Sequence, residues 1–367
     1  MRQIPDVFCT TPIVYAVGQD YQILVPVSAE TIMWVQVGEE RYCDDSNGVF
    51  RSNTTTHKMT VPMDVLDRAG GYTVCFRRVI ERKPYFSKTG EIEQYTSVFH
   101  PIPRDGQIKI YHIADAHNAV EAPVCAARCF DKPDLLILNG DIPNHSGKLS
   151  YLTTIHQLAS EITDGEAPVI FSRGNHDTRG IFAENIADHT PTRGGYSYFS
   201  FRLGKIWGLV LDCGEDKADD HPEYGNTICC SDFRRRETEY LKNIIKHSAE
   251  EYDAEGVKNR LVIVHNPFTQ SFEAPFDIED EVYSEWTELL KTHVKPQLML
   301  CGHVHDCRIS HVGSKYDNKG QFCPVICGSR PEKDRFIATS LTLDADGCRV
   351  IFNDSLKNIL HDEYKKF

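Results

Sequence analysis

The sequence lacks any hydrophobic run long enough for a membrane-spanning helix. Such a helix needs ~18 apolar residues, whereas the densest apolar run extends only from Leu135 to Leu138. The sequence also lacks an excess of positive charge, because 40 lysines and arginines stand against 53 aspartates and glutamates and leave a net charge of -13. This charge opposes non-specific adhesion to nucleic acid or anionic lipid. We therefore expect neither a nucleic-acid partner nor a membrane, and the oligomeric state stays open.

The sequence has no C-x-x-C pair, and residues 1–12 contain no apolar core of an export signal. Its 13 cysteines are an odd number and lack zinc-ribbon spacing. We expect them to be small buried hydrophobic residues in a protein of the reducing cytoplasm.

The length of 367 residues, with 41% hydrophobic and 25% charged residues, predicts two packed domains. In the first hundred residues Tyr21, Ile23, Val25 and Val27 alternate as in a strand, and no convincing helix interrupts this region. The pattern predicts a β-sandwich over residues 1–103. Residues 100–106, with two prolines and one glycine, are typical of a linker, so we expect a second domain over residues 104–367.

The pattern changes after the linker. Short apolar runs alternate with helical spacing between Leu149 and Ile162 and between Val282 and Leu290. The runs are Ile108–Ile113, Leu135–Leu138, Val169–Phe171, Ile206–Leu211, Leu261–Val264 and Leu298–Leu300. Runs of this kind are typical of strands that are buried on both faces between helices.

Ligand-type side chains follow five of these runs. They are Asp115 and His117, Asp141 after Gly140, Asn175 and His176 after Gly174, His265, and His303 and His305 after Gly302. Ligands converge at the carboxyl ends of strands in open α/β sheets. Two neighbouring divalent ions need a shared anion, and neutral imidazoles complete each shell. Asp141 is the natural bridge between them.

In this order, D-x-H, G-D, G-N-H-D, a lone histidine and G-H-x-H resemble the motifs of the calcineurin-like metallophosphoesterase family, over residues 108–355. The resemblance implies an αββα sandwich, of mixed α/β and α+β character, with a binuclear metal site at the carboxyl ends of its strands. By position, one ion would be held by Asp115, His117, Asp141 and His305, and the other by Asp141, Asn175, His265 and His303. His176 would be the catalytic acid.

A fibronectin- or Ig-like sandwich before such a domain, with a hairpin-like run over residues 196–212, is similar to the purple acid phosphatase branch. That branch has glycine where this chain has His117 and an iron-binding tyrosine where it has Asn144. The two departures are coupled, because an imidazole at one position does the ligand work of a phenolate at the other. We therefore expect two divalent ions (Mn, Fe, Zn, Co or Ni) and no iron-tyrosinate centre.

The expected chemistry is hydrolysis of a small phosphorylated substrate by a metal-bridging hydroxide, with phosphate monoesters preferred. A phosphodiesterase acting on cyclic nucleotides or other small diesters is the alternative, ahead of a nuclease or a catalytically silent binding protein. Asn144 is expected to orient His176, and His145 and Arg179 are candidate substrate-binding residues. We expect the acidic run over residues 215–223 to be a solvated loop and residues 234–236 to be an exposed face of a helix.

Overall fold

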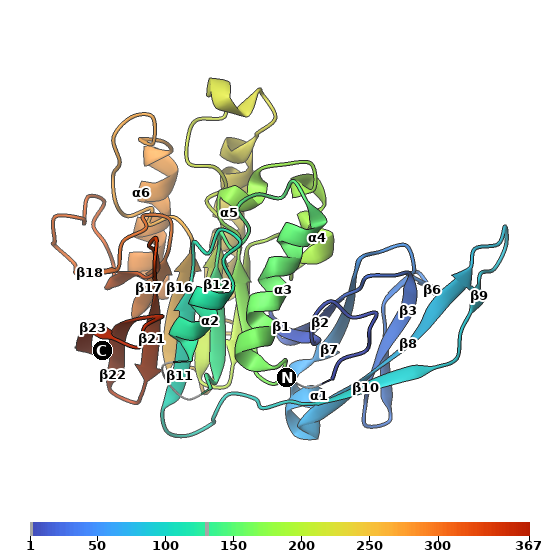
Figure 1. The fold of residues 1–367 in the computed structure, drawn as a ribbon. Helices are drawn as coiled ribbons and strands as arrows, with labels where there is room; N and C mark the ends of the chain where they lie inside the picture. Colours follow the sequence, from blue (N-terminus) through green and yellow to red (C-terminus); the bar gives the residue numbers. More distant parts are fainter. Residues whose placement is uncertain (1–2, 129–131) are drawn as a thin grey trace.

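The computed structural model describes residues 3–128 and 132–367, and Figure 1 shows their arrangement. Within these residues the largest sheet has ten strands. In spatial order they are β23 (Ile359–Lys366), β22 (Gly347–Asp354), β21 (Phe336–Leu343), β11 (Ile108–Ile113), β12 (Leu135–Asn139), β13 (Val169–Ser172), β1 (Ile13–Val17), β2 (Asp20–Pro26) and β7 (Thr56–Pro62), with β20 (Arg330–Pro331) on β21.

Two smaller sheets cover one face of this large sheet. The first has the order β14 (Phe199–Leu203), β15 (Ile206–Leu211), β16 (Asn259–Val264), β17 (Leu298–Cys301), β19 (Val325–Cys327) and β18 (Arg308–Ser310). The second has the order β10 (Glu93–Val98), β8 (Gly71–Glu81), β3 (Thr31–Val37) and β4 (Glu40–Cys43), with β9 (Lys88–Thr89) on β8. A two-stranded ribbon, β5 (Asp45–Ser46) and β6 (Val49–Phe50), lies beside them.

The helices complete the layers. They are α1 (Met63–Ala69), α2 (Glu121–Ala127), α3 (Leu149–Thr163), α4 (Ile186–His189), α5 (Cys230–Lys246) and α6 (Asp280–Leu289). Side chains of α2 and α3, such as Val124 and Ile155, pack on the outer face of the large sheet. Leu241 of α5 and Trp286 of α6 pack on the outer face of the six-stranded sheet. This is the αββα sandwich that the family resemblance implied, and burial on both faces explains why its strands are continuous apolar runs.

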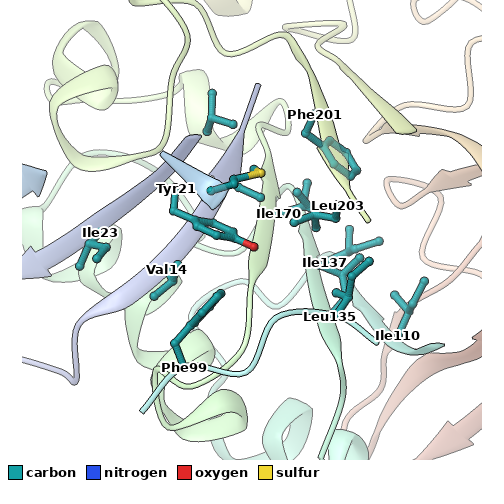
Figure 2. Close-up of a cluster of buried hydrophobic side chains, with 14 of the residues drawn as sticks. Val14, Tyr21, Ile23, Phe99, Ile110, Leu135, Ile137, Ile170, Phe201 and Leu203 are labelled. Atoms are coloured by element: carbon teal, nitrogen blue, oxygen red, sulfur yellow. The ribbon is translucent and has the colours of Figure 1, made fainter. Parts of the chain in front are cut away.

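The main core lies between the sheets and joins the two predicted domains. Figure 2 shows Val14 and Tyr21, from β1 and β2, in one cluster with Ile137, Ile170 and Phe201 of the C-terminal region. In addition, β1 pairs in parallel with β13. The N-terminal region is rich in strands, as expected, but its first strands extend the C-terminal sheet. The division at residue 103 and the fibronectin-like character of the first region stay predictions.

Some local expectations from the sequence are confirmed and others are wrong. The predicted hairpin over residues 196–212 is formed by the antiparallel strands β14 and β15. The expectation that no helix interrupts the first hundred residues is wrong, because α1 links β7 to β8. Among the cysteines of the described residues, seven are buried as expected, whereas Cys9 and Cys229 are exposed. Within residues 3–128 and 132–367, no helix is long and apolar enough to cross a membrane.

Candidate metal centre and active site

The residues predicted as metal ligands come together at the carboxyl ends of β11, β12, β13, β16 and β17. The first group joins Asp115, His117 and His305: His305 Nε2 lies 3.3 Å from Asp115 Oδ1 and 3.1 Å from His117 Nε2. Parallel neighbouring strands end at one edge of a sheet. For this reason side chains almost 200 positions apart in the sequence meet here.

The second group joins Asp141, His265 and His303. His265 Nε2 lies 3.1 Å from Asp141 Oδ2 and 3.7 Å from Asp115 Oδ1, so its ring lies between the two carboxylates. Asp141 also shares a third group with His117 and His176. Of the predicted ligands it is the carboxylate that reaches both sides of the cluster, which is the place of a bridging ligand.

Backbone conformation is unusual throughout this cluster. Five of the predicted ligands have a left-handed backbone, a conformation that is strained for residues other than glycine. They are Asp115 (φ 54°), His117 (φ 44°), Asp141 (φ 53°), His303 (φ 68°) and His305 (φ 47°). Each such residue costs roughly 1–3 kcal/mol, and strain of this kind gathers at functional sites. The fold therefore holds these side chains in place against their own backbone preference.

Two of the motif glycines allow this close approach. A Cβ atom on Gly140 would lie 2.6 Å from both Gly174 N and His265 Nδ1, and one on Gly174 would lie 2.3 Å from Asp141 Oδ1. No real Cβ atom tolerates such contacts, so these positions require glycine.

The arrangement of donor atoms fits a cation. The Asn175 amide oxygen faces two other lone-pair atoms, Asp141 Oδ2 at 3.2 Å and His303 Nδ1 at 3.1 Å. Without a cation these contacts favour the exchanged amide, whose nitrogen donates to both atoms. If a cation were bound here, the Asn175 oxygen would be one of its ligands. Oxygen and imidazole nitrogen atoms are the ligands that divalent transition metals accept.

The two buried carboxylates of the cluster also favour a positive charge beside them. Burial lowers the pKa of His265, but Asp141 and Asp115 outweigh burial and raise that pKa to about 10. Burial raises the pKa of Asp141, but His265 outweighs it and leaves the pKa well below the usual value. Burial lowers the pKa of His303 to about 4, so this ring is neutral at pH 7. A neutral imidazole is the form that binds a metal.

Hydrogen bonds behind the cluster fix the orientation of two rings. His265 Nδ1 bonds the carbonyl of Asn139 at 2.7 Å, and His176 Nδ1 bonds the carbonyl of Asn144 at 2.8 Å. A carbonyl only accepts, so each Nδ1 carries the proton and each Nε2 faces the site. Asn144 does contact His176 as predicted, but through its main chain and not through the expected side-chain amide.

The two candidate substrate-binding residues lie in different surroundings. Arg179 Nη1 lies 3.3 Å from His176 Nε2, at the edge of the ligand cluster. His145 contacts its own loop: its Nδ1 accepts from Gly147 N at 2.9 Å and its ring packs against Tyr151. The structure therefore brings Arg179, but not His145, into contact with His176.

The sequence reasoning missed two carboxylates that support this site. Asp177 is fully buried, and its Oδ2 accepts from Gly174 N at 2.7 Å and from Asp141 N at 3.1 Å. Glu215 is also fully buried, and its two oxygens accept from Arg179 Nε at 2.8 Å and Nη2 at 2.9 Å. The place of Asp177 in the G-N-H-D motif was a signal in the sequence. Nothing in the acidic run distinguished Glu215 from its neighbours.

The expectation of a solvated loop over residues 215–223 is therefore wrong at Glu215. The expectation of an exposed face is wrong at Arg234, whose side chain is 1% exposed. Arg234 Nε donates to the Cys213 carbonyl at 2.7 Å, and Nη2 donates to the Glu215 carbonyl. Burial raises the pKa of Glu215, but hydrogen bonds from Arg179 and Thr178 outweigh it and hold the pKa below its usual value.

The fold and this cluster together define a metal-dependent phosphoester hydrolase. The family model of calcineurin-like phosphoesterases matches residues 108–307, and the chain belongs to that family. No curated protein sequence matches this chain.

Two solved structures share the fold over nearly the whole chain. One is a purple acid phosphatase, PPD1, from yellow lupin (Lupinus luteus) seeds, with 11% sequence identity and a TM-score of 0.58 over 98% of this chain and 75% of that chain. The other is PhoD, with 11% identity and a TM-score of 0.56 over 99% of this chain and 90% of that chain. At this identity the similarity shows the fold alone.

Proposed function

We propose that this hydrolase acts on phosphate monoesters and uses two divalent ions. Asp115, His117, Asp141 and His305 would hold one ion, and Asp141, Asn175, His265 and His303 the other. A pair of divalent ions acidifies a water molecule and neutralises charge on the phosphoryl oxygens. Asp141 groups with His265 and His303 on one side and with His117 and His176 on the other, which supports this assignment.

The observation that carries the monoester preference is the fixed guanidinium of Arg179 beside His176. Its Nε and Nη2 are bound by Glu215, which leaves Nη1 directed at the site. A monoester presents a dianionic phosphoryl group, whereas a diester carries one negative charge. A third cation beside the metal ligands therefore favours the monoester.

His176 is the residue to which we assign proton transfer to the leaving oxygen. Its Nδ1 is bonded to the Asn144 carbonyl, so Nε2 is the atom that exchanges a proton with substrate. A cavity of about 640 Å³ lies beside Arg179, between residues 178–184 and 215–228. The alcohol part of the substrate would lie in this cavity.

Steady-state kinetics of metal-reconstituted protein on phosphomonoesters, phosphodiesters and cyclic nucleotides tests the proposal. We expect the highest kcat/KM on monoesters, and Arg179→Ala to reduce that value roughly 10- to 100-fold while reducing it less on diesters. A higher kcat/KM on diesters, or an equal loss on both classes in Arg179→Ala, would contradict the monoester assignment.

A further inference from the structure

Two polar side chains end the apolar rows that lie between the large sheet and the six-stranded sheet. Leu135 and Ile137 of β12 and Ile170 of β13 belong to the main core between the sheets (Figure 2). Side chains alternate along a strand, so Asn139 and Ser172, two residues further along β12 and β13, lie on the same face. These two residues are register partners, and both are fully buried. The layer of this core nearest the candidate metal centre is therefore polar.

The Asn139 side chain connects the two sheets. Its Nδ2 donates to the carbonyl of Leu300 on β17 at 3.0 Å and to the carbonyl of Val264 on β16 at 3.3 Å. The same nitrogen lies 3.0 Å from His112 Nε2 on β11. An amide NH2 group has two hydrogens, which these three acceptors share. The main-chain oxygen of Asn139 also accepts from His265 Nδ1 at 2.7 Å. One residue of the large sheet thus contacts both strands of the six-stranded sheet that lead to predicted ligands.

Each of the two proposed ion sites draws ligands from both sheets. The ligands that follow strands of the large sheet are Asp115, His117, Asp141 and Asn175, and those that follow strands of the six-stranded sheet are His265, His303 and His305. The spacing between the sheets therefore sets the distances among the donor atoms of one ion. Metal–ligand distances tolerate deviations of only about 0.2 Å. A small change in the spacing of the sheets would separate the two halves of each ligand set.

We propose that Asn139 is a positioning residue that holds the two sheets at the spacing that the metal ligands need. This inference rests on the proposed function, because it requires that the protein binds two ions. The bonds from Asn139 act on the strand ends that precede His265 and His303, and both histidines belong to the ligand set that contains Asn175. That set takes two residues from each sheet. The ion held by that set should therefore depend most on Asn139.

Two observations separate this role from a general contribution to stability. Within residues 3–128 and 132–367, Asn139 Oδ1 has no hydrogen-bond partner. An unpaired buried oxygen costs free energy, so burial alone does not favour an amide at this position. In addition, Ser172 makes a comparable bond between the sheets, since its Oγ donates to the Leu211 carbonyl of β15 at 3.3 Å. No proposed ligand follows β15 directly, so Ser172 is a matched control for Asn139.

Competition between the protein and a metal chelator, followed by elemental analysis, measures how tightly each ion is held. In Asn139→Ala we expect the more weakly held ion to bind roughly 10- to 100-fold more weakly, which is the usual loss when a residue that orients metal ligands is removed. In Ser172→Ala we expect both affinities to be unchanged. Asn139→Ser keeps one hydroxyl donor, so its loss should be smaller than that of Asn139→Ala, and it carries the test if the alanine variant does not fold.

The visible spectrum of the cobalt-substituted protein provides a readout that a general loss of stability would not change, because it reports the geometry of the ligands around the ion. It should change in the folded Asn139 variants and stay the same in Ser172→Ala. Unchanged affinities in the Asn139 variants, or an equal loss in Ser172→Ala, would overturn the role of Asn139 and leave the two-ion assignment intact. An unmodified protein that holds fewer than two ions would overturn that assignment, and this proposal with it.

Discussion

Glu215→Gln tests whether a buried carboxylate sets the direction of Arg179. Glutamine keeps the shape of glutamate but places an NH2 group against a guanidinium that was held at 2.8 and 2.9 Å. A hydrogen bond to a charged group contributes about 1.5–3 kcal/mol. The Arg179 side chain is 29% exposed, so solvent screens part of the loss. We expect the free energy of unfolding to fall by about 1–2 kcal/mol.

The loss of activity should exceed what this destabilisation explains. Arg179 would no longer be held toward His176, and a misplacement of about 1 Å in a positioning group costs up to roughly 100-fold. We therefore expect kcat/KM on a monoester to fall between about 10- and 100-fold. In the background of Arg179→Ala the same change at Glu215 should cost little more, because its effect acts through the arginine.

The pH dependence of stability provides a second readout. The folded-state pKa of Glu215 is held below its usual value of 4.5, so its stabilisation is fully present above that value. It is lost as the pH falls through the lowered folded-state pKa. The Glu215→Gln protein lacks this titrating group, so its free energy of unfolding should fall less on acidification than that of the unmodified protein. Chemical denaturation at several pH values between neutral and acid measures it.

Glu239→Gln is the control, because Glu239 lies on α5 outside the cavity and pairs with Lys242 at the surface. It should leave kcat/KM unchanged. Two results would refute the reasoning: a Glu215→Gln protein that is less stable but fully active, or losses in kcat/KM that simply add in the double variant with Arg179→Ala.

Three further predictions concern the acid, the metal and the N-terminal region. His176→Ala should reduce kcat most for alkyl phosphates and least for nitrophenyl phosphates, by about 10²- to 10⁴-fold for poor leaving groups; equal losses would indicate a binding role. Iron-loaded, oxidised protein should lack an intense visible tyrosinate band, because Asn144 stands where purple enzymes carry tyrosine; such a band would show that a tyrosine enters the site. A chain that starts at Arg104 should be insoluble, because it loses the strand paired with β13 and part of the main core; a soluble, metal-binding fragment would support independent domains.

The sequence predicted the C-terminal fold well because of how its strands are buried. Strands that are apolar on both faces are visible as short runs, and Ile108–Ile113 and Ile206–Leu211 coincide with β11 and β15. The candidate metal ligands were visible because each group of them follows such a run closely. The parallel pairing of β1 with β13 was not visible, since Tyr15 and Val169 are far apart in the sequence and no local pattern encodes their pairing.

The support around Arg179 could not be predicted for a related reason. Glu215 and Arg234 lie in segments whose composition is typical of exposed loops and helix faces. They are buried because each meets a partner of opposite charge or a carbonyl from another segment, and such pairing depends on tertiary structure. The contact between Asn144 and His176 was predicted, but the atom that makes it was not. The motif places the two residues close together, whereas the direction of the backbone decides that the Asn144 carbonyl, and not its side-chain amide, meets the ring.

The metal content of Asp141→Asn most directly tests the claim that one carboxylate serves two ions. Asp141 contributes to ligand groups on both sides of the cluster, and the amide of asparagine cannot supply the anion that two neighbouring cations share. We expect elemental analysis to find two metal ions per chain in the unmodified protein and fewer than two in the variant, with turnover lost. Two ions and normal turnover in Asp141→Asn would contradict the account.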